Sequence, residues 1–319
     1  MSWVTGNEVP GVSYAAYRTP FGVVIPTAGR VVAYVRSGNV QEQDPPEIKN
    51  KLVTDINTAL GRCRAGYGDI VVVLNGHTEN VATADAWSNL VAGTKIIGLG
   101  TDEDRPTFTW TTQLSSVLFN VANVSIDNLV FECAGPGAGV PLTVDNPILI
   151  SAAGCQINRC KIRAEIDANE GSTICINTTT AANGLTIANS KIYAAPGNGT
   201  IPTTLLRLVG TDAFTMVNTI IDGFTSNVNM GVMEMNTTAS LGIFIDKCTF
   251  VNRTAASVVA VVGLAGSTGT VKDSDLMVLV AGGVALNAAW TNPTLMQFAR
   301  VGVCEAVASN TGIGTPVSV

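Results

Sequence analysis

Apolar residues recur along this chain in a frame of eight positions. The first clear copy has the apolar pairs Val124/Ile126 and Leu129/Phe131, with Asn128 between the pairs. Copies of this frame begin at residues 124, 155, 185, 214, 243 and 269, so their spacing is 26 to 31 residues. Apolar residues two positions apart are typical of a strand. A repeat of roughly 20 to 50 residues indicates stacked supersecondary units.

The residue just before the second pair is polar in all six copies. The six residues at this place are Asn128, Arg159, Asn189, Asn218, Lys247 and Asp273. Asparagine tolerates the left-handed backbone conformation that a sharp corner between two strands needs. The sequence therefore predicts that Asn128, Asn189 and Asn218 lie in one corner column.

Each copy is preceded by a further strand with its own inward-facing pair. We predict these pairs as Val117/Phe119, Ile148/Ile150, Ile174/Ile176, Leu206/Leu208, Met233/Met235 and Ala260/Val262. The residues between them would then point outward in a column of Leu118, Leu149, Cys175, Arg207, Glu234 and Val261. Arg207 and Glu234 occupy the same place in neighbouring copies, so we expect them to pair. Strands joined by a tight corner every thirty residues or so predict the coils of a solenoid.

This pattern resembles the right-handed parallel β-helix of the pectate-lyase-like superfamily, in which an asparagine often marks the corner between two strands. The resemblance covers roughly residues 66–300 and implies an all-β fold. It is specific for architecture but weak for activity, because the superfamily includes lyases, hydrolases and structural virion proteins. No catalytic motif of the superfamily matches residue by residue.

The two ends of the chain depart from the repeat. Residues 1–46 carry aromatic residues among glycine and proline, which favours an N-terminal arm over a pad on the first coil. Residues 46–63 predict one helix that caps the first coil, because apolar residues keep helical spacing after Pro45 and Pro46. The apolar residues of this helix are Ile48, Leu52, Ile56, Leu60 and Cys63. The β-helix domain would span 47–300, and 301–319 would form a C-terminal tail.

Charge and composition narrow the range of partners. Only 13% of the 319 residues are charged, against about 25% in a typical soluble domain, and the mean hydropathy is +0.33. Such a surface favours large interfaces with copies of the chain or with other proteins. The net charge of −6 argues against nucleic acid. No apolar stretch has the length of a membrane helix, and the first residues carry no secretion signal, so we expect synthesis in the cytoplasm.

Residues able to do chemistry are few. His77, the only histidine, is predicted as an exposed turn residue without a nucleophile or a metal-ligating neighbour. Two clusters of three acidic residues are candidates for a catalytic carboxylate pair or a calcium site, although solvated turns are favoured for both clusters. They are Asp102, Glu103 and Asp104, and Glu165, Asp167 and Glu170. The seven cysteines include Cys155, Cys160 and Cys248 at inward positions, so buried free thiols are expected. We expect no catalytic residue, metal or cofactor.

The resemblance, together with low charge and an aromatic arm, implies a bacteriophage virion protein. The favoured function is a capsid cement or decoration protein that stands as a homotrimer on the shell. Leu118, Leu149 and Val261 would line the trimer face, and the arm, with Trp3, Tyr14, Tyr17 and Phe21, would contact the major capsid protein. The alternative is a tailspike or tail-fibre protein that binds or depolymerises cell-surface polysaccharide. A free polysaccharide lyase is a third, disfavoured class.

Overall fold

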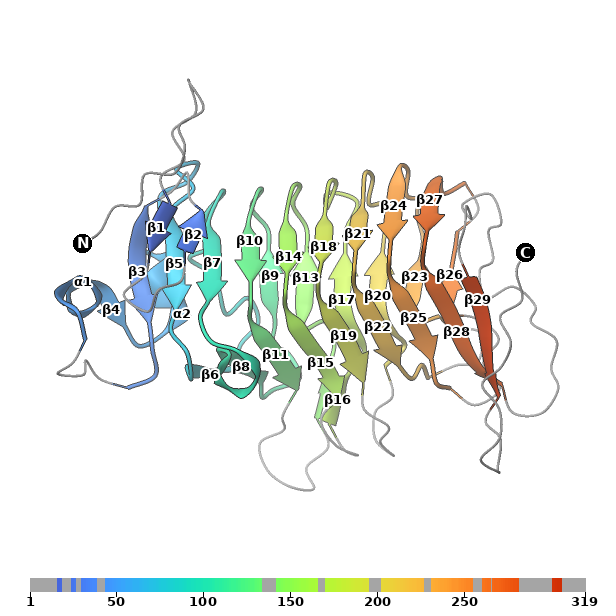
Figure 1. Ribbon diagram of the computed structural model, residues 1–319, viewed down its shortest axis with the longest axis horizontal. Coiled ribbons are helices and arrows are strands. Elements are labelled where there is room, and N and C mark those ends of the chain that lie inside the picture. Colours follow the sequence, from blue (N-terminus) through green and yellow to red (C-terminus); the bar gives the residue numbers. More distant parts are fainter. Residues whose placement is uncertain are drawn as a thin grey trace.

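The structure, a computed structural model, describes residues 16–18, 24–26, 30–38, 44–133, 142–165, 170–194, 202–226, 231–254, 260–264, 266–280 and 300–305. These residues form a parallel β-solenoid. Its strands stack side by side along the longest axis of the molecule, from blue to red (Figure 1), and follow sequence order except that β4 lies outside β3. From β5 onward, neighbouring strands of each of the three described sheets come from successive coils.

Three sheets run along this axis in the described part of the chain. The ten-stranded sheet contains, in spatial order, β27 (Gly269–Lys272), β24 (Ile243–Asp246), β21 (Thr215–Val217), β18 (Thr186–Ala188), β14 (Gln156–Asn158), β10 (Ser125–Asp127), β7 (Lys95–Gly98), β5 (Ile70–Val73), β3 (Val31–Val35) and β4 (Leu52–Val53). The eleven-stranded sheet contains β29 (Arg300–Glu305), β28 (Asp275–Val280), β25 (Thr249–Asn252), β22 (Ile220–Gly223), β19 (Lys191–Ala194), β15 (Lys161–Glu165), β11 (Val130–Cys133), β8 (Thr107–Trp110) and β6 (Thr78–Val81), with β12 (Leu142–Val144) and β16 (Glu170–Ser172) beside them. The six-stranded sheet contains β26 (Val261–Val262), β23 (Met233–Met235), β20 (Thr204–Leu208), β17 (Ile174–Thr178), β13 (Ile148–Ile150) and β9 (Val117–Phe119).

The sequence repeat corresponds to these coils. In the ten-stranded sheet Ile126 pairs in parallel with Ile157, and Ile157 pairs with Ile187, so equivalent frame positions are direct neighbours. All six residues between the apolar pairs have a positive φ, between 46° and 58°. Each of them joins a strand of the ten-stranded sheet to a strand of the eleven-stranded sheet. The prediction of a parallel β-solenoid is therefore confirmed.

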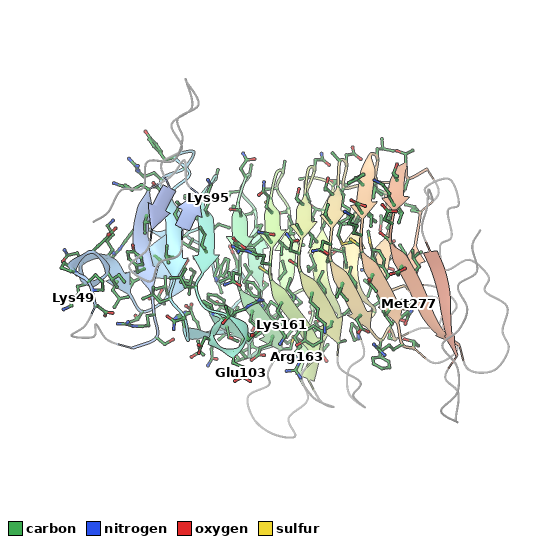
Figure 2. The ribbon with its side chains drawn as sticks, viewed as in Figure 1. Lys49, Lys95, Glu103, Lys161, Arg163 and Met277 are labelled. Carbon is green, nitrogen blue, oxygen red and sulfur yellow. The ribbon has the colours of Figure 1, made fainter. Side chains whose placement is uncertain are left out.

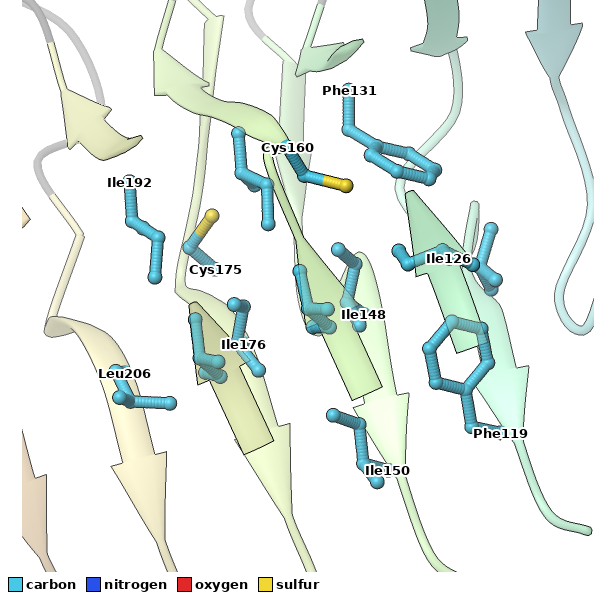
Figure 3. Close-up of a cluster of buried hydrophobic side chains, with 14 of the residues drawn as sticks. Phe119, Ile126, Phe131, Ile148, Ile150, Cys160, Cys175, Ile176, Ile192 and Leu206 are labelled. Atoms are coloured by element: carbon cyan, nitrogen blue, oxygen red, sulfur yellow. The ribbon is translucent and has the colours of Figure 1, made fainter. Parts of the chain in front are cut away.

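The interior of the solenoid is a single apolar column. Figure 3 shows Phe119, Phe131, Ile126 and Ile148 pointing into the space between the sheets. These side chains have no exposed surface, and they belong to one continuous cluster that extends from Val32 to Leu276. Fully burying one side chain of this size contributes about 1.5–3 kcal/mol to folding. The coils are therefore held together by a shared core as well as by the strand ladders.

The predicted register of the six-stranded sheet is right in part. Met233 and Met235 pair with Leu206 and Leu208, as expected. Ile148, however, pairs with Ile176, which was expected to pair with Ile150. The inward pair of β17 is therefore Ile176/Thr178.

Strict alternation fails where the chain enters these strands, because two successive residues face the core there. Cys175 and Ile176 are both buried in the core cluster, as are Ala260 and Val261. Met233 accordingly pairs with Val261. Cys175 and Val261 are thus interior residues, and neither can line an outer face. The outward column is Leu118, Leu149, Asn177, Arg207, Glu234 and Val262.

The single helix predicted over residues 46–63 is wrong. Two short helices, α1 (Pro46–Lys51) and α2 (Ile56–Leu60), flank β4. Leu52 is extended, with φ −67° and ψ 137°, and Val53 pairs with Val35 of β3. Asp55 then begins α2 by accepting a hydrogen bond from the Thr58 amide. Pairing with β3 therefore overrides the helical spacing of the apolar residues.

The ends of the chain are described only in part. β3 pairs with β5 in the ten-stranded sheet, so the solenoid sheet begins at Val31, upstream of residue 47. β1 (Ala16–Arg18), which contains Tyr17, forms an antiparallel pair with β2 (Val24–Pro26). β29 pairs in parallel with β28 and overlaps the predicted tail. Trp3, Tyr14, Phe21 and residues 306–319 lie outside the described residues.

Candidate functional site: a charged groove beside the corner column

A groove of about 980 Å³ follows the corner between the ten-stranded and eleven-stranded sheets. Its floor takes one residue from the start of each of six successive strands of the eleven-stranded sheet. These floor residues are Thr107, Val130, Lys161, Lys191, Ile220 and Thr249. Adjacent strands lie about 4.8 Å apart, so this row is about 24 Å long. The groove can therefore hold an extended chain laid along the solenoid axis.

The charges of the groove are polarised along its length. The N-terminal end carries Asp102 and Glu103, on the 3₁₀ turn η1 (Asp102–Asp104), together with Glu132. Lys161, Lys191 and Lys247 line the groove toward its C-terminal end. Figure 2 shows Lys161 and Arg163 on β15 close to the turn that carries Glu103. Arg105 lines the N-terminal end as well, beside the three carboxylates. An extended ligand would therefore meet a net negative charge at that end and positive charge along the rest.

Two lysines stand directly opposite each other in this groove. Lys161 and Lys191 are paired residues of β15 and β19. Their ammonium groups lie 5.7 and 4.8 Å from the ring centre of Tyr193. Within the described residues neither lysine forms an ion pair. Like charges opposite each other on neighbouring strands destabilise a sheet, so this pair is a feature that stability alone does not explain.

Three residues of the corner column, Asn189, Asn218 and Lys247, form one wall of the groove, and side-chain amides tie the column together. The side-chain amide of Asn218 donates to the side-chain oxygen of Asn189 at 2.9 Å, and the side-chain amide of Asn189 donates to the side-chain oxygen of Asn158 at 3.0 Å. Asn158 donates in turn to the carboxylate of Asp127 at 3.2 Å. Asn128 instead donates to the backbone oxygens of Gly98 and Gly100, both at 3.0 Å. The asparagines therefore make the wall rigid.

His77 lies in the interior, so its prediction as an exposed turn residue is wrong. Its ring has no exposed surface and lies 5.6 Å from the ring of Phe108. Nδ1 is 3.0 Å from the Ser37 hydroxyl, and Nε2 is 3.1 Å from a carboxylate oxygen of Glu79. Nothing local in the sequence indicates this contact, because Ser37 is 40 residues away.

The serine, histidine and glutamate resemble a hydrolase triad in composition, but their hydrogen bonds serve the fold. The Ser37 hydroxyl also accepts from the Thr78 amide at 2.8 Å and donates to the Thr78 carbonyl at 2.6 Å. Glu79 accepts from the Ile56 amide at 2.9 Å. This network ties β3, β6 and the start of α2 together, and the serine oxygen is held by backbone groups.

The acidic residues considered from the sequence are distributed unevenly. Asp102 and Glu103 line the groove, whereas Asp104 does not. Glu165 and Glu170 lie in β15 and β16, and the structure describes only their backbone; Asp167 lies outside the described residues. Among the described residues no group of three or more His, Cys, Asp and Glu could hold a metal ion. In that same part of the chain, no helix has the length and apolar character to span a membrane.

The described cysteines are structural. The six whose side chains the structure describes are all free, and five are buried. Burial raises the pKa of the Cys160 and Cys175 thiols to about 12 and that of Cys248 to about 11. These thiols therefore stay protonated at neutral pH and act as small apolar residues.

The outer column of the six-stranded sheet is the second candidate surface. Leu118 and Leu149 are opposite neighbours there and are partly exposed. Arg207 and Glu234 are also opposite neighbours and form an ion pair, which confirms the pairing expected from the sequence. The Glu234 side chain is only 3% exposed. This column therefore offers leucine at one end and a neutralised charge pair farther along.

No family model, no curated protein and no solved structure matches this chain. The fold class is stated from the strand pairing alone: it is a parallel β-solenoid. Function has to be argued from the groove and from the outer face of the six-stranded sheet.

Proposed function

We propose that this chain is a structural protein of a bacteriophage particle, a decoration protein that stabilises the capsid as a homotrimer. The observation that carries the proposal is the outer column of the six-stranded sheet. Leu118 and Leu149 are partly exposed there, and Val262, which pairs with Glu234, takes the outward position that the sequence predicted for Val261. Asn177, Arg207 and Glu234 lie between the two leucines and Val262, so the apolar residues occupy the two ends of the column. Exposed apolar residues at fixed places on a rigid rod are suited to packing against copies of the same rod.

The charges of this face are compatible with burial. Arg207 and Glu234 neutralise each other within one chain, so a neighbouring copy would not bring an unpaired charge into the interface. A parallel trimer would place three such faces around one axis, with the leucines of each copy in contact. The composition supports the same arrangement, since only 13% of the residues are charged.

The attachment to the shell belongs to the N-terminal segment in this proposal. Its aromatic residues would contact the major capsid protein, which locates the assembled protein at the virion surface.

The trimer is tested by the double variant Leu118→Lys/Leu149→Lys. We expect wild type to have the mass of a trimer in light scattering, and the variant to have the mass of a folded monomer with an unchanged circular dichroism spectrum. The matched control is Gln156→Lys/Thr186→Lys, on the outer face of the ten-stranded sheet, which should remain trimeric. A monomeric wild type would refute the trimer, and a trimeric double variant would move the interface to another face.

Attachment to the capsid is tested with purified phage heads. Full-length protein should co-sediment with the heads, whereas a variant lacking residues 1–29 should stay in the supernatant as an intact trimer. Equal sedimentation of both forms would exclude the N-terminal segment as the attachment.

The alternative function is that of a tailspike or tail-fibre protein that binds or cleaves polysaccharide. The observation in its favour is the groove, which is long enough for several sugar rings and contains Asp102, Glu103 and Glu132. A panel of bacterial surface polysaccharides would decide between the two functions. Cleavage by wild type that is lost in Asp102→Asn would replace the decoration protein with this alternative, and we expect no cleavage.

A further inference from the structure

We propose that the groove binds an extended acidic peptide segment of another protein, with one carboxylate placed between Lys161 and Lys191. This site lies on the eleven-stranded sheet, apart from the face proposed for the trimer, so the two proposals stand or fall separately. The first argument is the unpaired charge. Two ammonium groups held opposite each other, without a carboxylate partner among the described residues, form a site for an anion.

The second argument is the order of side chains along the groove floor. Val130, Lys161, Lys191 and Ile220 follow one another in successive strands, so the two lysines lie between two aliphatic residues. Ile220 is 42% exposed, which is unusual for an isoleucine in a strand that also contributes to the core. The floor therefore offers apolar, positive, positive and apolar positions at equal steps.

These steps match an extended peptide. The floor positions are about 4.8 Å apart, so Val130 and Ile220 are separated by about 14 Å, and the midpoint of the two lysines lies about 7 Å from either. An extended peptide rises about 3.4 Å per residue, so side chains on one face occur about every 7 Å. A segment with aliphatic residues at positions 1 and 5 and glutamate at position 3 fits all four floor residues. The glutamate would meet both lysines at once.

The lining chemistry favours a peptide over an acidic polysaccharide. Aromatic rings are the usual platforms for sugars, but none of the residues that line the groove is aromatic. The nearby Tyr193 ring is surrounded by Lys161, Lys191 and the Arg163 guanidinium, whose carbon lies 5.9 Å from the ring centre. Asn189 and Asn218, at the rim, can bond the amide groups of a peptide backbone.

The acidic end of the groove gives the peptide a direction. Asp102 and Glu103 lie on η1, just before β8, and together with Glu132 they outnumber Arg105 at the N-terminal end of the groove. A basic residue that precedes or follows the segment by a few positions would be attracted to this end. The recognised sequence is therefore an aliphatic–acidic–aliphatic core with a basic residue at one side.

The test uses synthetic peptides and the full chain. The probe is a labelled, end-capped peptide Lys-Ser-Leu-Thr-Glu-Thr-Leu-Ser, followed by fluorescence polarisation at low salt. Two control peptides keep its composition or its shape: in one the Glu is moved to the neighbouring position, where it faces away, and in the other Lys replaces Glu. An oligogalacturonide of similar length serves as the acidic glycan.

The protein variants are Lys161→Gln/Lys191→Gln and Ile220→Thr. The matched control is Lys95→Gln/Lys272→Gln, on the outer face of the ten-stranded sheet, which changes the net charge equally. We expect the probe to bind wild type and the control variant with the same Kd. The lysine variant should lose at least tenfold in affinity, and Ile220→Thr should lose about threefold. Circular dichroism melting should confirm that all variants are folded.

Several results would overturn the proposal. Equal binding of the probe and of the peptide with the displaced Glu would show that the spacing plays no part. Equal loss of affinity in the lysine variant and in the control variant would show that the probe responds to the net charge of the protein and not to the two lysines of the groove. Tighter binding of the oligogalacturonide than of the probe would assign the groove to a glycan, and no binding of the probe at millimolar concentration would remove the site.

Discussion

Replacing Leu208 with aspartate tests the central feature of the fold, the inward orientation of the six-stranded sheet. Leu208 has no exposed surface and lies in the core cluster opposite Met235. Removing its side chain from the core costs about 2–5 kcal/mol, as in Leu→Ala substitutions. The buried carboxylate adds several kcal/mol more, because no described cation is its neighbour in the core cluster. The total equals most or all of the usual stability of a domain, about 5–15 kcal/mol.

We therefore expect Leu208→Asp not to give a folded protein. Leu208→Ala, the graded companion, should fold with a free energy of unfolding lowered by about 2–5 kcal/mol. Gln156→Asp, at an exposed outward position of β14, is the control and should change stability by less than about 0.5 kcal/mol. Urea denaturation followed by circular dichroism gives all three values. If Leu208→Asp unfolded at the same urea concentration as wild type, the inward assignment and the shared core would both be wrong.

Three further perturbations test the ion pair, the corner and the thiols. Arg207→Ala removes the ion-pair partner of the nearly buried Glu234 and should lower the free energy of unfolding by about 1–3 kcal/mol. The double variant Arg207→Ala/Glu234→Ala should lower it by less. Equal urea midpoints for the two variants would show that burial of Glu234 is unimportant. Asn189 has φ +51°, a left-handed backbone conformation in which a Cβ atom is unfavourable. Asn189→Ala should therefore lower stability by about 1–2 kcal/mol, and Asn189→Gly should lower it by less. Thermal melting should rank the two variants in this order, and the reverse order would contradict the corner assignment. The pKa of Cys160 and of Cys175 is raised to about 12 from the usual 9.0, so the unfolded chain loses these protons first. The contribution of these two thiols to stability should be constant below about pH 9 and fall between about pH 9 and 12. A cysteine-to-alanine double variant should show a shallower fall in this range, and an identical profile there would remove the thiols as its cause.

The coils could be predicted from the sequence because their signals are local. A two-residue apolar period places side chains inside, and a polar residue between two such runs indicates a corner, as Asn128, Asn189 and Asn218 illustrate. The Arg207–Glu234 pair followed from the same repeat, since equal positions in successive coils become neighbours.

The features that escaped prediction depend on contacts between distant parts of the chain. The bend into the six-stranded sheet turns Cys175 and Val261 inward, and alternation alone does not indicate it. Helical spacing at 46–63 is interrupted because Val53 pairs with Val35. His77 is buried by contacts with Ser37 and Phe108, which lie 40 and 31 positions away in the sequence.

The groove belongs to this second group as well. Its lysines come from strands thirty residues apart, and nothing in the residues around Lys161 distinguishes it from an ordinary surface lysine. Lys161 and Lys191 occupy the same place in successive copies of the frame, so the repeat alone makes them neighbours; that they line a groove together with residues of η1 appears only in the structure. The charge pair thus becomes visible from the strand pairing and from the contacts of Tyr193.

The amide ladder of the corner column makes the length of this molecule adjustable in whole coils. From Asn218 through Asn189 and Asn158 every amide donates in the same direction, and the series ends on the carboxylate of Asp127, which pairs with Arg159. Asn189 and Asn158 both donate and accept within this series, so a duplicated coil with asparagine at the corner would extend the series by one more bond of the same kind. Duplication or loss of a repeat of about thirty residues could therefore lengthen or shorten the rod in steps of about 4.8 Å, while both of its ends keep their neighbours.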